Sequence, residues 1–226
     1  MPDRRRRVTL SRSQRRIVLW RHGRTEWNLA GRVQGQSDTQ LDDVGREQAR
    51  AAAARLAALE PDRIVSSDLV RAHDTARQLG EVTGREIELD PRLREMNFGE
   101  REGMTWREAW AAFPDGMRAW VEGDETQIPG SETHRQAGER FADALRDHLV
   151  KLPAGGTLVV VAHGAVLRTG VCSFLQIPET HWSSLGGLSN CSWSVLEENR
   201  SGDWSKWRLT EWNAGTLPEP VMSDEE

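Results

Sequence analysis

Short apolar runs alternate with amphipathic stretches along most of the chain. The runs at 17–20 and 158–162 are rich in β-branched residues and are followed closely by a glycine, and Ile64-Val65-Ser66 is a third, shorter stretch of this kind. This pattern predicts short buried strands. An alanine-rich helix is expected after Asp42, and a second helix, capped by Ser67 or Asp68, is expected to end near Gly80. Strands that alternate with helices predict a three-layer α/β/α domain with a mostly parallel central sheet.

Two parts of the chain break this alternation. Residues 91–131 predict short helical pieces that carry three tryptophans, Trp106, Trp110 and Trp120. We expect a small helical lid over the sheet edge there, with a plain packed insertion as the alternative. Near the C-terminus, the stretches Cys191–Glu198 and Ser205–Trp212 predict a hairpin, because each reads as a strand and a polar turn separates them.

The composition is that of an ordinary globular domain, with 37% hydrophobic and 29% charged residues among 226. We expect one domain over residues 16–214, a disordered basic N-terminus over 1–15 and a disordered tail over 215–226. The net charge of −5 gives no general case for nucleic-acid binding. No apolar stretch is long enough to span a membrane or to form the core of a signal peptide, so no membrane partner and a cytoplasmic location are expected.

Two histidines stand in the same local setting. His22 follows the first apolar run and precedes Gly23, and His163 follows the run at 158–162 and precedes Gly164. The carboxyl ends of parallel strands are where ligands bind in an open α/β sheet, so these two side chains are expected to meet in one pocket. Arg21 and Arg24 flank the first histidine and would attract anions. The other four histidines, His73, His134, His148 and His181, are expected to face solvent.

Further motifs accompany the two histidines in a fixed order. They are Arg21-His22-Gly23-Arg24-Thr25-Glu26-Trp27-Asn28, Ser66-Ser67-Asp68-Leu69-Val70-Arg71-Ala72, Leu93-Arg94-Glu95-Met96-Asn97-Phe98-Gly99-Glu100, Pro129-Gly130-Ser131-Glu132 and Val161-Ala162-His163-Gly164. In this order they resemble the histidine phosphatase superfamily, which has the phosphoglycerate-mutase-like fold. The resemblance covers nearly the whole chain, from about residue 15 to residue 213.

The resemblance implies roles that suit the chemistry of the residues. His22 matches the nucleophile that becomes phosphohistidine, because a largely neutral imidazole can attack phosphorus. Arg21 and Arg71 match clamps on the phosphoryl group, which guanidinium forks bind well. His163 matches a second donor to the same oxygens. Glu95 matches the acid that protonates the leaving group, a task that burial of a neutral carboxyl would favour.

Four further residues are expected to bind the substrate. Asn28 and Gln34 match polar positions that hold phosphate, Arg24 is a candidate for meeting a carboxylate, and Thr133 offers a hydroxyl at a helix start. The family often has Pro-Gly-Gly-Glu-Ser where this chain has Pro129-Gly130-Ser131-Glu132-Thr133. This departure affects the placement of the loop and its contact with substrate.

The segment between Glu95 and His163 is short, which resembles the phosphatases of the superfamily more than its mutases. The run from Trp182 to Trp193 resembles an actinobacterial branch that acts on glucosyl-3-phosphoglycerate. The resemblance therefore implies hydrolysis of a small phosphorylated metabolite, no cofactor, no metal and a homodimer.

Three alternatives stay open at this point. The first is a cofactor-dependent phosphoglycerate mutase. The second is a metal hydrolase that uses His22, Glu26 and His163, which the surrounding arginines disfavour because they would repel a cation. The third is an inactive anion-binding or scaffold protein, against which the intact set of His22, Arg71, Glu95 and His163 argues.

Overall fold

The computed structural model describes residues 14–199 and 206–215. These residues form a six-stranded sheet in the order β3-β2-β4-β1-β5-β6. The central strands β1 (Arg16–Arg21) and β4 (Thr157–Ala162) pair in parallel, and β2 (Arg63–Ser66) and β3 (Ile87–Leu89) extend the parallel part. The C-terminal hairpin, β5 (Trp193–Glu198) and β6 (Trp207–Ala214), adds two antiparallel strands beside β1. The predicted α/β fold with a mostly parallel sheet is confirmed.

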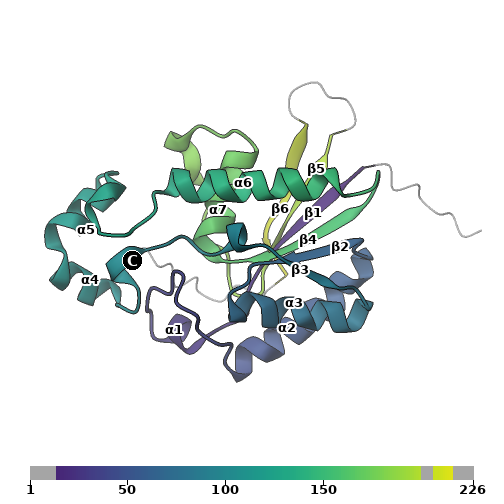
Figure 1. Cartoon of the computed structure of the whole chain (residues 1–226), viewed down its shortest axis with the longest axis horizontal. Helices are drawn as coiled ribbons and strands as arrows, with labels where there is room; N and C mark the ends of the chain where they lie inside the picture. Colours follow the sequence, from purple (N-terminus) through teal and green to yellow (C-terminus); the bar gives the residue numbers. More distant parts are fainter. Residues whose placement is uncertain (1–13, 200–205, 216–226) are drawn as a thin grey trace, which may run out of the picture.

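Helices cover both faces of this sheet (Figure 1). Helices α6 (His134–Val150) and α7 (Gly164–Phe174) lie on one face and pack on each other, whereas α2 (Asp43–Leu56) and α3 (Val70–Thr83) lie on the other. Asp42 caps α2, as predicted. The start of α3 differs from the prediction, because its first N–H group, that of Val70, donates to Asp38 rather than to a side chain of Ser67 or Asp68.

The two faces explain why the central strands are apolar throughout. In β1, Ile17 and Leu19 belong to the cluster under α6 and α7, whereas Val18 and Trp20 belong to the cluster under α2 and α3. All four side chains are fully buried. Each contributes about 1.5–3 kcal/mol to folding by leaving water. A strand with two covered faces shows no polar alternation, so the sequence reads as one apolar run.

The segment expected to form a lid consists of short helices at one end of the molecule (Figure 1). Helices α4 (Trp106–Ala112) and α5 (Pro114–Val121) and the 3₁₀ turn η4 (Glu125–Gln127) share a small core of Ala109, Met117 and Ile128, separate from the main clusters. We call this part of the chain, residues 104–128, the helical insertion. It is joined to the sheet by an irregular stretch that includes the 3₁₀ turns η2 (Pro91–Leu93) and η3 (Gly99–Arg101).

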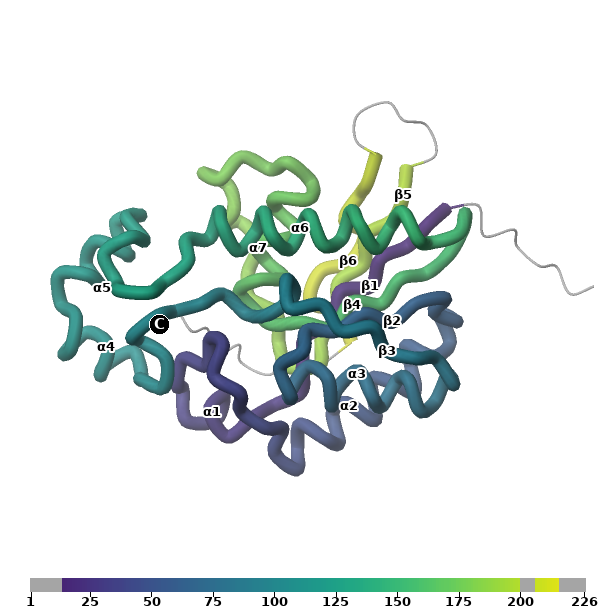
Figure 2. The backbone as a smooth tube through the Cα atoms, in the orientation of Figure 1, coloured from purple at the N-terminus to yellow at the C-terminus, as the bar shows by residue number. Residues whose placement is uncertain are grey.

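The chain trace in Figure 2 shows that β1 and β4 lie side by side although most of the chain separates them. Most of the predicted basic terminus and of the predicted tail lies outside the described residues. Arg15, at the edge of the described part, is held by an ion pair of 2.7 Å with Glu198. Within the described residues, no helix is both long enough and apolar enough to cross a bilayer.

Candidate active site

His22 and His163 meet at the carboxyl edge of the sheet. The last residues of β1 and β4, Arg21 and Ala162, are register partners, so the histidines that follow them are neighbours. Their ring centroids are 5.1 Å apart, and the side chains are almost completely buried. Gly23 is required beside His22, because a Cβ at that position would overlap the carbonyl oxygen of Gly45. The prediction that the two histidines meet is therefore confirmed.

The His22 ring is oriented by its own main chain. Nδ1 lies 2.7 Å from the carbonyl oxygen of Gly23, which accepts its hydrogen. The lone pair of the neutral ring is then on Nε2. Burial, and the positive charges of Arg71 and Arg21, hold the pKa of His22 well below its usual value of 6.5. The imidazole is consequently neutral near pH 7, which is the form that can act as a nucleophile.

His163 is held by Ser67, a residue whose sequence context indicates only helix capping. The Nε2 atom of His163 lies 2.8 Å from Oγ of Ser67. In the tautomer that accepts the Ser67 hydrogen, Nδ1 carries the ring hydrogen, and this buried atom has no partner among the described residues. Burial and the charge of Arg71 also hold the pKa of His163 well below 6.5. His163 therefore offers a neutral, unpaired donor next to His22.

Arg21 and Arg71 bring two cationic groups to the histidine pair. Arg71 is fully buried, and its Nη1 and Nη2 atoms donate to the carbonyl oxygens of Ser37 and Gly35, each at 2.7 Å. Burial lowers the pKa of Arg71 to about 10, so the guanidinium keeps its charge at neutral pH. Nη1 of Arg21 donates to the carbonyl oxygen of Leu188, and its Cζ would lie 3.4 Å from a Cβ placed on Gly164.

Three buried donors in this pocket have no hydrogen-bond partner within the described part of the chain. They are Nε of Arg21, Nε of Arg71 and Nδ1 of His163. Buried polar groups without partners are uncommon in native proteins. A tetrahedral anion with several acceptor oxygens is the kind of ligand that satisfies such a set, since charge-assisted hydrogen bonds to guanidinium groups are strong.

Glu95 joins this pocket to α7. Its carboxylate is buried and accepts N–H groups of Met96 at 2.8 Å, Val166 at 2.8 Å and Ala165 at 3.1 Å. Burial alone was expected to keep the carboxyl neutral. The three N–H donors also hold both carboxylate oxygens in a defined orientation. The structure therefore gives Glu95 a fixed position and a set of donors that the sequence did not reveal.

The four predicted substrate-binding residues lie in different settings. Gln34 is buried, and its Oε1 accepts the hydroxyl hydrogens of Thr25 and Thr39. Asn28 completes the capping box of the short helix α1 (Glu26–Leu29), Arg24 forms an ion pair of 2.7 Å with Asp42, and Thr133 caps α6. Thr133 also lines a different pocket, described below.

The alternative metal set of His22, Glu26 and His163 is not assembled. Glu26 is exposed, whereas both histidines are buried. In residues 14–199 and 206–215, no group of three or more His, Cys, Asp and Glu side chains is arranged to hold a metal ion.

One prediction about the remaining histidines is wrong. His148 was expected to face solvent but is only 2% exposed. Its Nε2 lies 2.9 Å from Oδ2 of Asp90. The hydrogen bond to Asp90 stabilises the buried imidazole, and the helical pattern around His148 contains no sign of that partner.

Glu102 is an important residue that sequence reasoning missed. Its carboxylate accepts the N–H groups of Gln36, Ser37 and Phe98 and the hydroxyl hydrogen of Ser37, at distances of 2.9–3.3 Å. These contacts fix the loop whose carbonyl oxygens hold Arg71. A glutamate in a loop gives no local sequence signal of such a role, because Gln36 and Ser37, which it fixes, lie more than sixty residues earlier in the chain.

Comparison with known proteins supports this geometry. A family model described as the histidine phosphatase superfamily (branch 1) matches residues 17–215. A glucosyl-3-phosphoglycerate phosphatase of Mycobacterium tuberculosis is 39% identical over 216 residues, which cover 88% of this chain and 95% of the relative. A metal-independent phosphoserine phosphatase of Arabidopsis thaliana is 38% identical over 201 residues, which cover 87% of this chain and 80% of that protein.

The fold is likewise shared with solved structures. The structure of a mycobacterial glucosyl-3-phosphoglycerate phosphatase in complex with VO3 matches this chain with a TM-score of 0.80 at 39% sequence identity. The match covers 89% of this chain and 100% of the other.

Proposed function

This chain belongs to the histidine phosphatase superfamily and is a phosphate monoester hydrolase, and we propose that its substrate is glucosyl-3-phosphoglycerate. The observation that carries the proposal is the pair of neutral, buried histidines 5.1 Å apart, flanked by Arg21 and Arg71. The choice of substrate is supported by the relatives of that name. The resemblance of the run from Trp182 to Trp193 supports the same choice.

The first half of the proposed reaction transfers the phosphoryl group to His22. Nε2 of His22 attacks phosphorus, a P–N bond forms and the bond from phosphorus to the ester oxygen breaks. Arg21, Arg71 and His163 donate hydrogen bonds to the three equatorial oxygens, where charge is spread in the transition state. Glu95 gives its proton to the departing ester oxygen, and this proton transfer leaves a neutral alcohol and a carboxylate.

The second half returns the enzyme to its starting state. Water attacks the phosphorus of phosphohistidine, and the ionised Glu95 takes one of its protons. The P–N bond breaks and inorganic phosphate leaves. The three N–H groups around Glu95 keep its carboxylate in position for both proton transfers. Neither step needs a metal ion, so the proposal includes metal-independent turnover.

Phosphate release from glucosyl-3-phosphoglycerate tests the substrate, with a coupled assay for interconversion of 2- and 3-phosphoglycerate run beside it. We expect rapid phosphate release and little interconversion. Robust mutase turnover with little phosphate release would replace the proposal by the mutase alternative. A cytoplasmic location and a homodimer are further predictions, and light scattering of the purified protein checks the second.

A further inference from the structure

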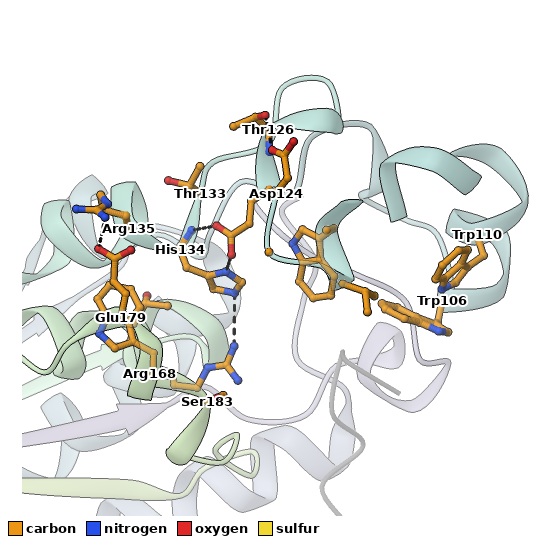
Figure 3. Close-up of a pocket in the computed structure, with 16 residues that line it drawn as sticks. Trp106, Trp110, Asp124, Thr126, Thr133, His134, Arg135, Arg168, Glu179 and Ser183 are labelled. Carbon is orange, nitrogen blue, oxygen red and sulfur yellow. Dashed lines mark hydrogen bonds and ion pairs between the residues drawn. The ribbon is translucent and has the colours of Figure 1, made fainter. Parts of the chain in front are cut away.

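A pocket of about 880 Å³ lies between the helical insertion and the helices α6 and α7. Trp106, Trp110 and Trp120 of the insertion form part of its wall, and Trp182 of the 3₁₀ segment η5 (Glu179–Ser184) adds a fourth indole. Figure 3 shows Trp106 and Trp110 on one side of this pocket and His134, Arg168 and Glu179 on the other. Its size lies within the range of small-molecule sites, which are about 300–1,000 Å³.

The pocket shares helix α7 with the Glu95 site. Helix α7 begins directly after His163, and its first N–H groups hold the Glu95 carboxylate. Arg168 and Thr169 of the same helix line the pocket. At a rise of about 1.5 Å per residue, Arg168 lies only about 8 Å along the helix axis from His163.

A second connection leads from Glu95 to the opposite wall. Arg140 donates to the carbonyl oxygen of Glu95 at 2.9 Å and to the carboxylate of Glu132 at 2.8 Å. Thr133 and His134, which follow Glu132, line the pocket. In the proposed reaction Glu95 protonates the leaving alcohol. The leaving alcohol must therefore lie near Glu95, and α6 and α7, which both contact Glu95, also form walls of this pocket.

The charges in the pocket differ from those around the histidines. Arg135 pairs with Glu179 at 2.7 Å, and the His134 ring pairs with Glu125. The lining contains two arginines against three carboxylates, those of Asp124, Glu125 and Glu179. A second phosphoryl group would meet no excess of positive charge here. The pocket suits a neutral group.

The side chains also define what kind of neutral group fits. Indole rings supply broad apolar faces with a polar edge. Hydroxyl groups of Thr126, Thr133 and Ser183 stand beside them. A hexose has the matching character, since its ring presents apolar C–H faces and a rim of hydroxyl groups.

We infer that this tryptophan-lined pocket binds the glucosyl group of the substrate while the phosphoryl group lies between His22 and His163. The inference rests on the proposed function and adds the subsite that recognises the leaving alcohol. It assigns substrate selection to the helical insertion and to η5, and phosphoryl transfer to the edge of the sheet.

The test compares kcat/KM for glucosyl-3-phosphoglycerate with kcat/KM for 3-phosphoglycerate, which lacks the sugar. Ser183→Phe fills the pocket from an exposed position, and Ser184→Phe is the matched control, because Ser184 is also exposed but does not line the pocket. We expect the ratio to fall about tenfold or more in Ser183→Phe and in Trp106→Ala, and to stay at the wild-type value in Ser184→Phe. If Trp106→Ala fails to fold, Ser183→Phe carries the test alone.

A binding measurement tests the proposed subsite independently of catalytic turnover. Glucosylglycerate, the dephosphorylated product, should change the tryptophan fluorescence of the wild type and of Ser184→Phe at concentrations that leave Ser183→Phe unaffected, and glycerate should change none of them. An equal ratio in wild type and Ser183→Phe would overturn the subsite while phosphate release keeps the proposed function. Absence of phosphate release from glucosyl-3-phosphoglycerate by the wild type would overturn the proposed substrate itself.

Discussion

The carboxylate of Glu102 and the guanidinium of Arg71 bind opposite sides of the same loop, residues 35–37. Glu102 accepts the N–H groups of Gln36 and Ser37, and Arg71 donates to the carbonyl oxygens of Gly35 and Ser37. Gly35 has a φ of +52°, and a Cβ there would overlap the Glu102 carboxylate. Glu102 is therefore a positioning residue that acts on the phosphate pocket through this loop.

Replacing Glu102 should weaken the binding of phosphate mimics. In Glu102→Gln the side chain loses acceptor capacity toward the loop, so Arg71 loses its fixed carbonyl partners. Hydrogen bonds to charged groups are worth about 1.5–3 kcal/mol, so we expect vanadate inhibition to weaken about 10–100-fold. Vanadate inhibition and thermal unfolding should be measured together, with the exposed neighbour variant Glu100→Gln as control. Wild-type vanadate affinity in Glu102→Gln would show that the loop does not need this carboxylate.

His22→Ala should abolish the covalent step. Removal of the nucleophile is expected to lower kcat by roughly 10³-fold or more, because water must then attack the ester directly. Wild-type protein quenched during turnover of ³²P-labelled substrate should carry acid-labile, alkali-stable label, and the variant should carry none. His73→Ala, which changes a histidine outside the pocket, is the control. Near-normal turnover by His22→Ala contradicts the assignment.

Glu95→Gln should discriminate between leaving groups. A p-nitrophenolate needs little protonation as it leaves, whereas the alkoxide of glucosyl-3-phosphoglycerate needs a proton. We expect the variant to lose about 10²-fold more kcat on the alkyl ester than on p-nitrophenyl phosphate. Steady-state kinetics on both substrates provide the measurement. Equal losses on both would assign Glu95 to structure or to binding, which its three N–H contacts also allow.

Vanadate should inhibit the wild type, and EDTA should not. Vanadate bound at the two histidines adopts the trigonal-bipyramidal shape of the transferring phosphoryl group, so a site that stabilises the transition state binds it tightly. Inhibition should be measured with p-nitrophenyl phosphate before and after exhaustive dialysis against EDTA. A requirement for added divalent metal after dialysis is incompatible with the proposed mechanism.

The buried pair of Asp90 and His148 should make the free energy of unfolding depend on pH in the acid range. Burial opposes ionisation of Asp90, but hydrogen bonds from Arg92 and His148 outweigh it and lower the pKa of Asp90 from 3.8 to about 2. A lowered folded-state pKa stabilises the protein above the unfolded value, and this stabilisation is lost as the pH falls from about 4 to 2. A shift of this size corresponds to about 2 kcal/mol in the free energy of unfolding.

Urea unfolding at pH 7 and at several values between 4 and 2 measures this loss. Asp90→Asn should be less stable than the wild type at pH 7 and should lose less stability over the acid range. The exposed variant Asp147→Asn, which also faces Arg92, is the control. If the free energy of unfolding fell equally with pH in wild type and Asp90→Asn, the Asp90 carboxylate would be excluded as the source of the acid-dependent loss of stability.

Local patterns were enough to predict the sheet and the histidine pair. The apolar runs before His22 and His163 can be recognised as strands without any distant residue. The carboxyl ends of parallel strands lie at the same edge of a sheet, so the two histidines are expected to meet. The residues that hold the site were not predictable in this way. Ser67, Asp38 and Glu102 act on segments distant in sequence, and nothing in their immediate neighbours marks these contacts. The same limit applies to His148, whose burial depends on a carboxylate from another element.

The contact between Gly23 and Gly45 limits how this active site could be transferred to another protein. The peptide after His22 lies directly against the main chain of the first turn of α2, with no room for a methyl group between them. The main chain next to His22 is thus supported by helix α2 as well as by strand β1. A transplanted strand with its Arg-His-Gly sequence would present an imidazole without its support. The smallest segment that could be transferred consists of β1, the loop after it and the start of α2.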